Sequence, residues 1–478
     1  MKATGDEYFD SEEFRKLLAE YEEAVSAGLP VFMDADELSE IADYYQMDER
    51  FDQADQAISL ALSLSPGAIA PLTYKIHEAL WNGDTEGARK YLEQITETDE
   101  PDYIYDKAEI MLAEGREEEA DRYLRDEFKK VPPDEYQDYV VDVANIYTDY
   151  NYPEKAMQWM ARARQEDTAD FKELMARTLF GLGKYQDSEK IWGELIDVNP
   201  FSKHYWNALA STQFMNEDYS HSVESSEYAI AIDPEDPEGL LTKANGLYHL
   251  YNYEEALKYY QRYSQHVPDD EFGLMHQGTC LINLGRNDEA ISMLNKAIQT
   301  APPDSPYLGD IWQELSFAYS EQGDDDKALE ALDQSDQHGA DKVQTLVVRG
   351  HLCLSSGQVD EAERHFRDAV LASDTPSQTL VRIIVSLYDN HYLNAAYSLF
   401  KRFFSVVDDD FNEGYAYMAL CCYDLKKYDE FLAYLKTACQ RCPRECKIAL
   451  SHIFPDDVKP QDYYNYIKDR MQPPTPNS

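Results

Sequence analysis

The sequence predicts an all-α solenoid, in which pairs of antiparallel helices stack along one axis. Three observations support this prediction: a spacing near 34 residues recurs along the chain, small residues return at two fixed positions in it, and a proline returns near its end. Self-similarity with a period of about 20 to 50 residues is typical of solenoids and related arrays.

The clearest repeat begins at Lys203 and reads KHYWNALASTQFMNEDYSHSVESSEYAIAIDPE. With Lys203 counted as position 1, the positions that define the repeat hold Trp206 (4), Leu209 (7), Ala210 (8), Tyr219 (17), Ala229 (27) and Pro234 (32). Aligned on position 8, twelve repeats start near Ala35, Ile69, Pro101, Gln137, Ala169, Lys203, Pro237, Glu271, Gly309, Val343, Ser377 and Asn412. Six of the eleven spacings are 34 residues, which sets the period.

The small residues at positions 8 and 20 have a physical reason. Two helices approach closely only where their side chains are small, and a large residue at the crossing would overpack it by about 1–3 kcal/mol. Position 8 is mostly alanine, glycine or serine, and position 20 is mostly alanine or serine. Gly183, Gly285, Gly323 and Gly357 are expected to give the turn its positive φ, and the proline near position 32 ends the second helix.

This pattern resembles the tetratricopeptide repeat (TPR) family, over about residues 35 to 443. The resemblance weakens at repeats two and eleven, where position 8 holds Ile76 and Ile384. It implies a right-handed superhelix in which first helices line a concave groove and second helices lie outside. It also implies that first-helix positions 2, 5, 9, 12 and 13 face the groove.

The expected domain organisation follows the array. Residues 1–33 form an N-terminal capping helix, 34–443 the twelve repeats, 444–471 C-terminal capping helices, and 472–478 a disordered tail. A proline-rich loop over 302–308 offers a possible joint between two subarrays.

The chain carries 92 acidic and 43 basic residues, a formal net charge of −49. Such a charge repels phosphate backbones and anionic membranes, so we predict no nucleic-acid and no membrane partner. Either the charge keeps the chain soluble, or it also recognises basic segments of a partner. The chain has no long apolar run and no secretory signal, and its seven cysteines are an odd number. These features predict a reduced, cytoplasmic protein, whose oligomeric state stays open.

The sequence contains no catalytic constellation, so we expect no enzyme and no cofactor. GLGK at 181–184 lacks the rest of a phosphate-binding loop and falls at a predicted turn. The cysteines near the end are Cys421, Cys422, Cys439, Cys442 and Cys446, and the spacing of the last three would suit zinc. Since cysteine is more often a small buried residue, we predict no metal site there.

Carried onto repeats one to five, the groove positions of the family give an acidic wall: Asp36, Asp43, Asp102, Glu109, Asp138, Asp149, Asp170 and Glu173. These acids either attract Lys- or Arg-rich segments or are merely solvated.

In repeats five to eight the same faces mix aromatic, amide and small polar groups, which suit a peptide backbone and its anchors. This predicted peptide-binding set is Arg177, Phe180, His204, Asn207, Ser211, Phe214, Asn245, Tyr248 and Met275. The family's carboxylate clamp uses lysine at position 5, which is absent from every repeat, so we do not predict clamp-type binding.

The leading hypothesis is a non-catalytic scaffold or adaptor that binds an extended peptide segment in the groove. Three alternatives stay open: an assembly chaperone or signalling regulator that flexes on binding, a metal-binding or enzymatic protein that uses the cysteine cluster, and a self-assembling structural protein.

Overall fold

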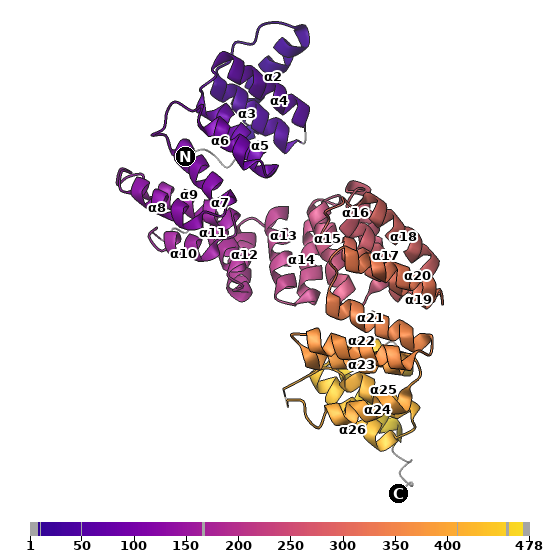
Figure 1. The fold of residues 1–478 in the computed structure, drawn as a ribbon. Coiled ribbons are helices and arrows are strands. Elements are labelled where there is room, and N and C mark those ends of the chain that lie inside the picture. Colours follow the sequence, from indigo (N-terminus) through magenta and orange to yellow (C-terminus); the bar gives the residue numbers. More distant parts are fainter. Residues whose placement is uncertain are drawn as a thin grey trace. The chain divides into compact units, whose positions relative to one another are not determined.

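The computed structural model describes residues 8–9, 11–48, 50–164, 168–408, 410–455 and 458–471, and the predicted tail over 472–478 lies outside these ranges. Every regular element in them is a helix, which confirms the all-α prediction. Within each part of the chain, successive helices pack beside one another (Figure 1). The chain forms two compact units, unit 1 (Met1–Val198) and unit 2 (Asn199–Ser478), which we describe separately.

Unit 1 opens on α2 (Glu12–Ala27), where the Ser11 hydroxyl accepts a hydrogen bond from the Phe14 amide at 3.1 Å. Helix pairs follow, each with a first and a second helix joined by a short turn. The first helices are α3 (Ala35–Met47), α5 (Ile69–Trp81), α7 (Pro101–Ala113), α9 (Tyr136–Asp149) and α11 (Ala169–Gly181). Their second helices are α4 (Phe51–Leu64), α6 (Thr85–Leu92), α8 (Glu117–Phe128), α10 (Pro153–Met160) and α12 (Tyr185–Val198).

Unit 2 continues the same alternation. Its first helices are α13 (Lys203–Met215), α15 (Pro237–His249), α17 (Glu271–Asn283), α19 (Leu308–Glu321), α21 (Lys342–Ser355), α23 (Pro376–Asp389) and α25 (Tyr415–Asp424). Its second helices are α14 (Tyr219–Ile232), α16 (Tyr253–His266), α18 (Asn287–Thr300), α20 (Asp325–Gln337), α22 (Val359–Ala372), α24 (Leu393–Phe403) and α26 (Tyr428–Arg441).

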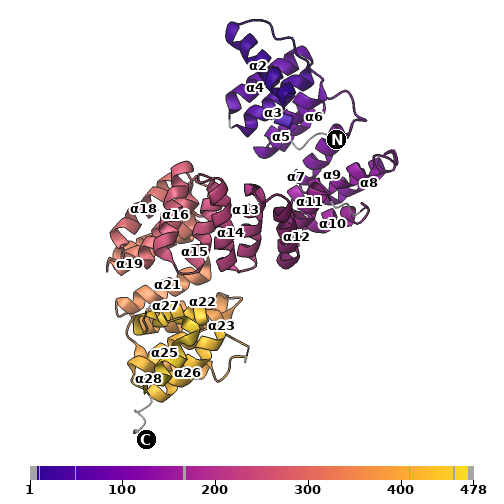
Figure 2. The same cartoon turned by 180° about the vertical axis from the view of Figure 1, so that it is seen from behind.

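The chain ends in α27 (Pro443–Leu450), two short 3₁₀ turns (Ser451–Ile453 and Pro460–Asp462) and α28 (Tyr463–Met471). Helix α27 packs on α25 and α26, and α28 packs on α26 (Figure 2). The Glu445 carboxylate of α27 accepts hydrogen bonds from the Gly414 and Ala416 amides at 2.6 and 2.8 Å, which caps the start of α25. The loop over 302–308 lies inside unit 2, where α18 and α19 pack directly on each other.

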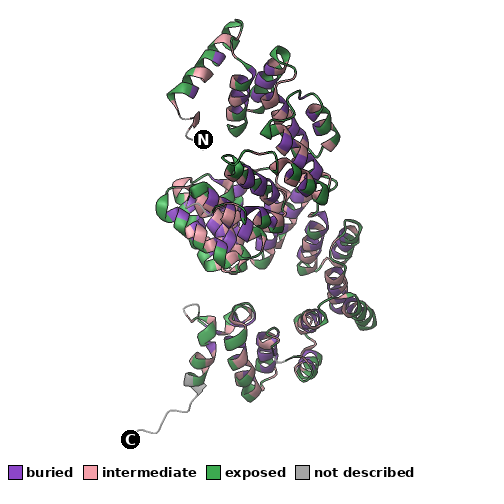
Figure 3. Ribbon diagram, turned by 90° about the vertical axis from the view of Figure 1, so that its left-hand side faces the viewer, coloured by how far each residue is buried: buried purple, intermediate pink, exposed green. Residues whose placement is uncertain are grey.

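Small residues lie at the predicted crossing points. Ala108, Ala144 and Ala210 at position 8 are fully buried, as is Ala120 at position 20. Figure 3 shows buried residues along the helix faces that meet inside the stack. At Gly278 even a methyl group is too large, because an added Cβ would lie 2.6 Å from the Leu294 side chain. Close packing at these positions therefore sets the spacing of the two helices in a repeat.

The predicted glycine turns are confirmed: Gly183, Gly285, Gly323 and Gly357 have φ between +69° and +78°. Five turns in the described ranges place another residue in this left-handed region, and these residues are Asn151, Glu217, Tyr251, His391 and Lys426. A side chain there costs about 1–2 kcal/mol. These turns therefore keep a side chain at a position where glycine would be less strained.

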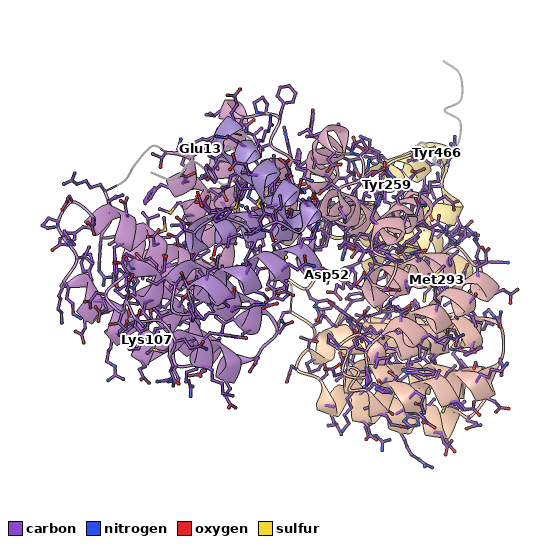
Figure 4. All side chains as sticks on the ribbon, turned by 90° about the horizontal axis from the view of Figure 1, so that it is seen from above. Glu13, Asp52, Lys107, Tyr259, Met293 and Tyr466 are labelled. Atoms are coloured by element: carbon purple, nitrogen blue, oxygen red, sulfur yellow. The ribbon has the colours of Figure 1, made fainter. Side chains whose placement is uncertain are left out.

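One buried lysine is fully paired. Lys243 on α15 is 7% exposed, and its ammonium donates to Glu227 at 2.9 Å and to the Tyr259 hydroxyl at 2.7 Å. Tyr259 is labelled on α16 in Figure 4. This charge belongs to the packing between helices and is not free to bind a ligand.

Among the described residues, no helix is both long and apolar enough to cross a membrane.

Candidate functional site

The eight acids of the predicted wall all lie on first helices of unit 1, namely α3, α7, α9 and α11. Six of them are exposed: Asp36, Asp43, Asp102, Asp138, Asp149 and Asp170. Glu109 and Glu173 are half-buried. Because water screens exposed charges, the half-buried acids would contribute more to the binding of a cation than the exposed ones.

Glu109 belongs to a cluster of polar side chains on α5, α7 and the end of α9. His77 Nε2 lies 3.2 Å from Asp106 Oδ1 and 3.5 Å from Glu109 Oε2. Asp106 is buried and also accepts a hydrogen bond from the Thr73 hydroxyl at 2.7 Å, while the Tyr150 hydroxyl donates to Glu109 at 3.4 Å. Asp106 is not among the predicted site residues, because it lies at position 6 of its repeat and the expected groove positions are 2, 5, 9, 12 and 13.

The ionisation of this cluster is shifted by its surroundings. Desolvation raises the pKa of Glu109 to about 7, although the nearby charge of His77 acts in the opposite direction. Desolvation alone would lower the pKa of His77, but the hydrogen bond to Asp106 and the charge of Glu109 outweigh it, and the pKa is raised. A further cation placed beside Glu109 would stabilise its charged form.

Arg177, the basic member of the predicted peptide-binding set, is engaged with the acidic wall. Its guanidinium donates to the Asn145 side-chain oxygen at 3.2 Å and forms an ion pair with Asp149. All three residues lie on the first helices α9 and α11. Arg177 therefore neutralises part of this wall, and a ligand that binds it would have to compete with Asp149.

The nine residues of the predicted peptide-binding set do not fall in one unit. Arg177 and Phe180 belong to unit 1, and the other seven lie on α13, α15 and α17 in unit 2. We therefore describe the nine residues as two groups, one in each unit.

Within unit 2, the set contributes to a row of rings. Phe214 contacts His249 with centroids 5.3 Å apart, and Tyr248 contacts His249 at 5.7 Å and His276 at 5.8 Å. Tyr219 stacks on His249 at 4.6 Å. Desolvation lowers the pKa of both histidines, which keeps them neutral at pH 7. His204 is exposed and Ser211 half-buried on α13.

Three members of the set are engaged in packing. Asn207 is 2% exposed, and its amide nitrogen donates to Asp236 at 2.7 Å. Met275 is buried, and the Asn245 oxygen accepts a hydrogen bond from the Tyr260 hydroxyl at 2.6 Å. Their positions in the repeat predicted that these side chains face the groove. Their burial and hydrogen bonds show that they also take part in the packing between helices.

A cavity of about 880 Å³ lies further along unit 2, against the first helices of repeats nine to twelve. Its apolar wall includes Phe317, Val347, Val381 and Val385. The charged and polar residues that line it include Glu217, Glu321, Gln344, His351, Arg382, Asp389, Glu413, Arg441, Arg444 and Glu445. The cavity combines an apolar surface with charges of both signs.

The lining of this cavity follows the groove positions of the family. Val347 and Val381 are at position 5, Phe317 and Val385 at position 9, and Asp389 at position 13. The positional rule that gave the acidic wall would have found these residues if it had been carried on to repeats nine to twelve. The predicted peptide-binding set in repeats five to eight lies on other first helices than this cavity, and it stays a prediction.

The seven cysteines are free thiols, and six of them are buried while Cys442 is half-buried. Burial raises the pKa of Cys421 to about 12 and that of Cys422 to about 11, which keeps both protonated. Within the described ranges, no three histidine, cysteine, aspartate or glutamate side chains are grouped to hold a metal ion. The C-terminal cysteines belong to the apolar core around α25 and α26.

Comparison with known proteins bears on these features. A family model described as tetratricopeptide repeat matches residues 174–237 and 241–306. These residues include the repeat that begins at Lys203, from which the period was defined. The chain contains tetratricopeptide repeats. A search of curated protein sequences finds no significant match.

Several solved structures are similar to all or part of this chain. One is YrrB, described as a TPR protein with an unusual peptide-binding site, at 19% identity over 40% of this chain and 96% of YrrB, with a TM-score of 0.34. MamA from Desulfovibrio magneticus RS-1 matches at 15% identity over 37% of this chain and 97% of its own, with a TM-score of 0.34. The Cut9–Hcn1 hetero-tetramer of the APC/C matches at 13% identity over 97% of this chain and 94% of its own, with a TM-score of 0.37.

The repeat architecture supports a protein–protein interaction scaffold with protein or peptide partners.

Proposed function

We propose that this TPR protein is a non-catalytic scaffold that binds an extended segment of another protein along the faces of its first helices. The observation that carries the proposal is the cavity in unit 2, because four successive first helices, α19, α21, α23 and α25, each contribute side chains to it. A ligand that contacts four stacked helices in turn is extended, as a peptide chain is.

The chemistry of the cavity suits a peptide. Valines 347, 381 and 385 offer an apolar wall for an anchoring side chain, and Gln344 and His351 offer polar groups to a backbone. Cavities of about 300–1,000 Å³ with an apolar lining and a few polar groups are the usual size and composition of binding sites. The volume of about 880 Å³ therefore accommodates several residues of an extended segment.

The charges favour basic segments. Desolvation raises the pKa of Asp389, which lines the cavity, to about 6. It also raises the pKa of Glu314 to about 7, on the first helix α19 but not among the residues that line the cavity. Glu109 in unit 1 is shifted in the same direction. A desolvated carboxylate without a matching cation is unfavourable, and a lysine or arginine of the partner would relieve this cost. We therefore propose partners with basic segments, with no nucleic acid and no membrane among them.

Free thiols and the acidic composition support the cytoplasm as the place where the protein acts.

The experiment is a selection from a displayed library of random twelve-residue segments, followed by affinity measurement of the selected peptides. Val385→Trp places a bulky side chain in the cavity of unit 2, whereas Leu371→Trp is its matched control on the outer helix α22, where Leu371 is 78% exposed. We expect selected segments to be rich in lysine and arginine, and to lose at least about tenfold in affinity for Val385→Trp only.

Equal affinity of wild type and both variants for the selected segments would place their binding outside this cavity. Selection of acidic segments would contradict the proposed charge preference and leave the cavity itself as the site.

A further inference from the structure

Helix α27 has two different faces. One face packs on α25 and α26 and buries Cys446, Ala449 and Leu450. On the same helix, the Glu445 carboxylate accepts hydrogen bonds from the two amides at the start of α25. Arg444, Lys447 and Ile448 are exposed. Because residues three and four apart lie on one side of a helix, these three form a single outward stripe.

This stripe contacts two turns that lie about two hundred residues earlier in the chain. The Arg444 guanidinium donates to the Glu217 carbonyl at 3.0 Å and lies 4.8 Å from the centre of the Tyr219 ring. The Lys447 ammonium donates to the Leu250 carbonyl at 2.9 Å. The two carbonyls belong to the turns after α13 and α15, so one helix at the end of unit 2 bridges the first two repeats of that unit.

Both receiving turns have an unusual backbone. Glu217 and Tyr251 have φ of +58° and +59°, in the region where six other described turns between the two helices of a repeat use glycine. Both residues line the cavity of unit 2, as do Arg444 and Ile448 of α27. The contact between α27 and the two turns is therefore also part of the cavity wall.

We infer that α27 is a latch that closes the cavity of unit 2, and that its release from the turns after α13 and α15 admits the partner segment. This inference rests on the proposed function, since it assigns a regulation to the same site. The inner face of α27 stays packed on α25, and only the outer stripe separates from the turns.

The latch contact is suited to opening. It consists of hydrogen bonds from exposed side chains to two neutral carbonyls, together with one cation–ring contact. In the open form water replaces these partners, so each bond contributes little net stability. The buried inner face has no such replacement, because its apolar side chains would be exposed to water.

Cys442 gives a direct readout of the cavity. It is the half-buried cysteine, and it lines the cavity beside α27. The experiment measures the rate at which a bulky maleimide labels Cys442 in the full-length chain, located by peptide mass spectrometry. In Arg444→Ala/Lys447→Ala we expect labelling to be about tenfold faster, because two hydrogen bonds of ordinary net strength are lost. Burial and the neighbouring Glu445 carboxylate raise the pKa of the Cys442 thiol. Removing two cationic side chains would not make this thiol more acidic, so faster labelling reports access to it.

Two comparisons separate the latch from general effects of charge or folding. Arg402→Ala/Lys468→Ala removes the same charges from α24 and α28, away from the latch, and should leave the rate unchanged. Tyr219→Leu acts from the opposite side of the contact and should raise the rate severalfold. The latch is overturned if the Arg444→Ala/Lys447→Ala rate equals that of wild type, or if wild type already reacts at the rate of the urea-unfolded chain.

A second measurement tests the latch through binding of the library-selected peptides. If the closed latch excludes ligand, Arg444→Ala/Lys447→Ala binds them severalfold more tightly, since more of the chain is competent to bind. Equal affinity would overturn the role of α27 in admission even with faster labelling. If no peptide binds any variant, the proposed function fails, and the Cys442 rates alone decide whether the latch opens.

Discussion

Gly350 shows how closely the two helices of one repeat approach. A Cβ added at this position would lie 2.3 Å from the Phe366 ring of the second helix, so that the ring would have to move. We expect Gly350→Ala to lower the free energy of unfolding by about 1–3 kcal/mol. Thermal unfolding of Gly350→Ala and of Gly350→Ala/Phe366→Leu checks this, because the smaller leucine should recover part of the loss. No recovery would show that the ring is not the obstacle.

Glu314 gives unit 2 a pH-dependent stability. Burial raises its pKa in the folded chain to about 7, so the folded state holds this proton more tightly than the unfolded state. Its favourable contribution is therefore complete below the unfolded-state pKa and is lost as the pH rises through 7. We expect Glu314→Gln to stabilise the protein by about 1–2 kcal/mol at pH 8 and to have little effect at pH 5. Thermal unfolding of wild type and Glu314→Gln at pH 5 and pH 8 measures this difference. An equal stability change at both pH values would contradict the raised pKa of Glu314.

Among the elements, α27 is held by its buried apolar face and also by one carboxylate at the start of α25. Glu445 accepts hydrogen bonds from Gly414 and Ala416, the amides at the start of α25. Glu445→Ala leaves these amides without that partner, at a cost of about 1–3 kcal/mol. We expect faster hydrogen exchange of the Gly414 and Ala416 amides in this variant. Exchange near Gly183, in unit 1, serves as the internal reference and should stay the same.

A contact could be predicted from the sequence when its two residues lie close together along the chain, within one repeat. The period, the small residues at position 8 and the glycine turns report contacts within one repeat, and they predicted the helix pairs. The burial of Asn207 depends on Asp236, which belongs to the loop before the next repeat. The bond of Arg444 to Glu217 joins residues 227 apart, and no local pattern records it. The groove rule failed to reach the unit 2 cavity only because it was applied to repeats one to eight.

For the whole molecule, charge is the dominant property. The formal net charge of −49 implies long-range attraction of basic segments, which salt screens. Raising the salt concentration from about 0.05 to 0.5 M should weaken binding of lysine-rich peptides about tenfold, chiefly through the association rate. Asp138→Lys on the first helix α9 should weaken it further, and Asp126→Lys on the second helix α8 should not. Stopped-flow kinetics measures this, and equal effects of the two variants would mean that only net charge matters.

The most direct test of the groove as a binding site is to map where a bound segment lies. A library-selected peptide that carries a photoreactive phenylalanine is cross-linked to the full-length chain, and the attachment sites are identified by mass spectrometry. Attachment to Val347, Val381 or Val385 on α21 and α23 is the predicted result. Attachment to the outer helices α20, α22 or α24, with none on those valines, would contradict binding in the groove.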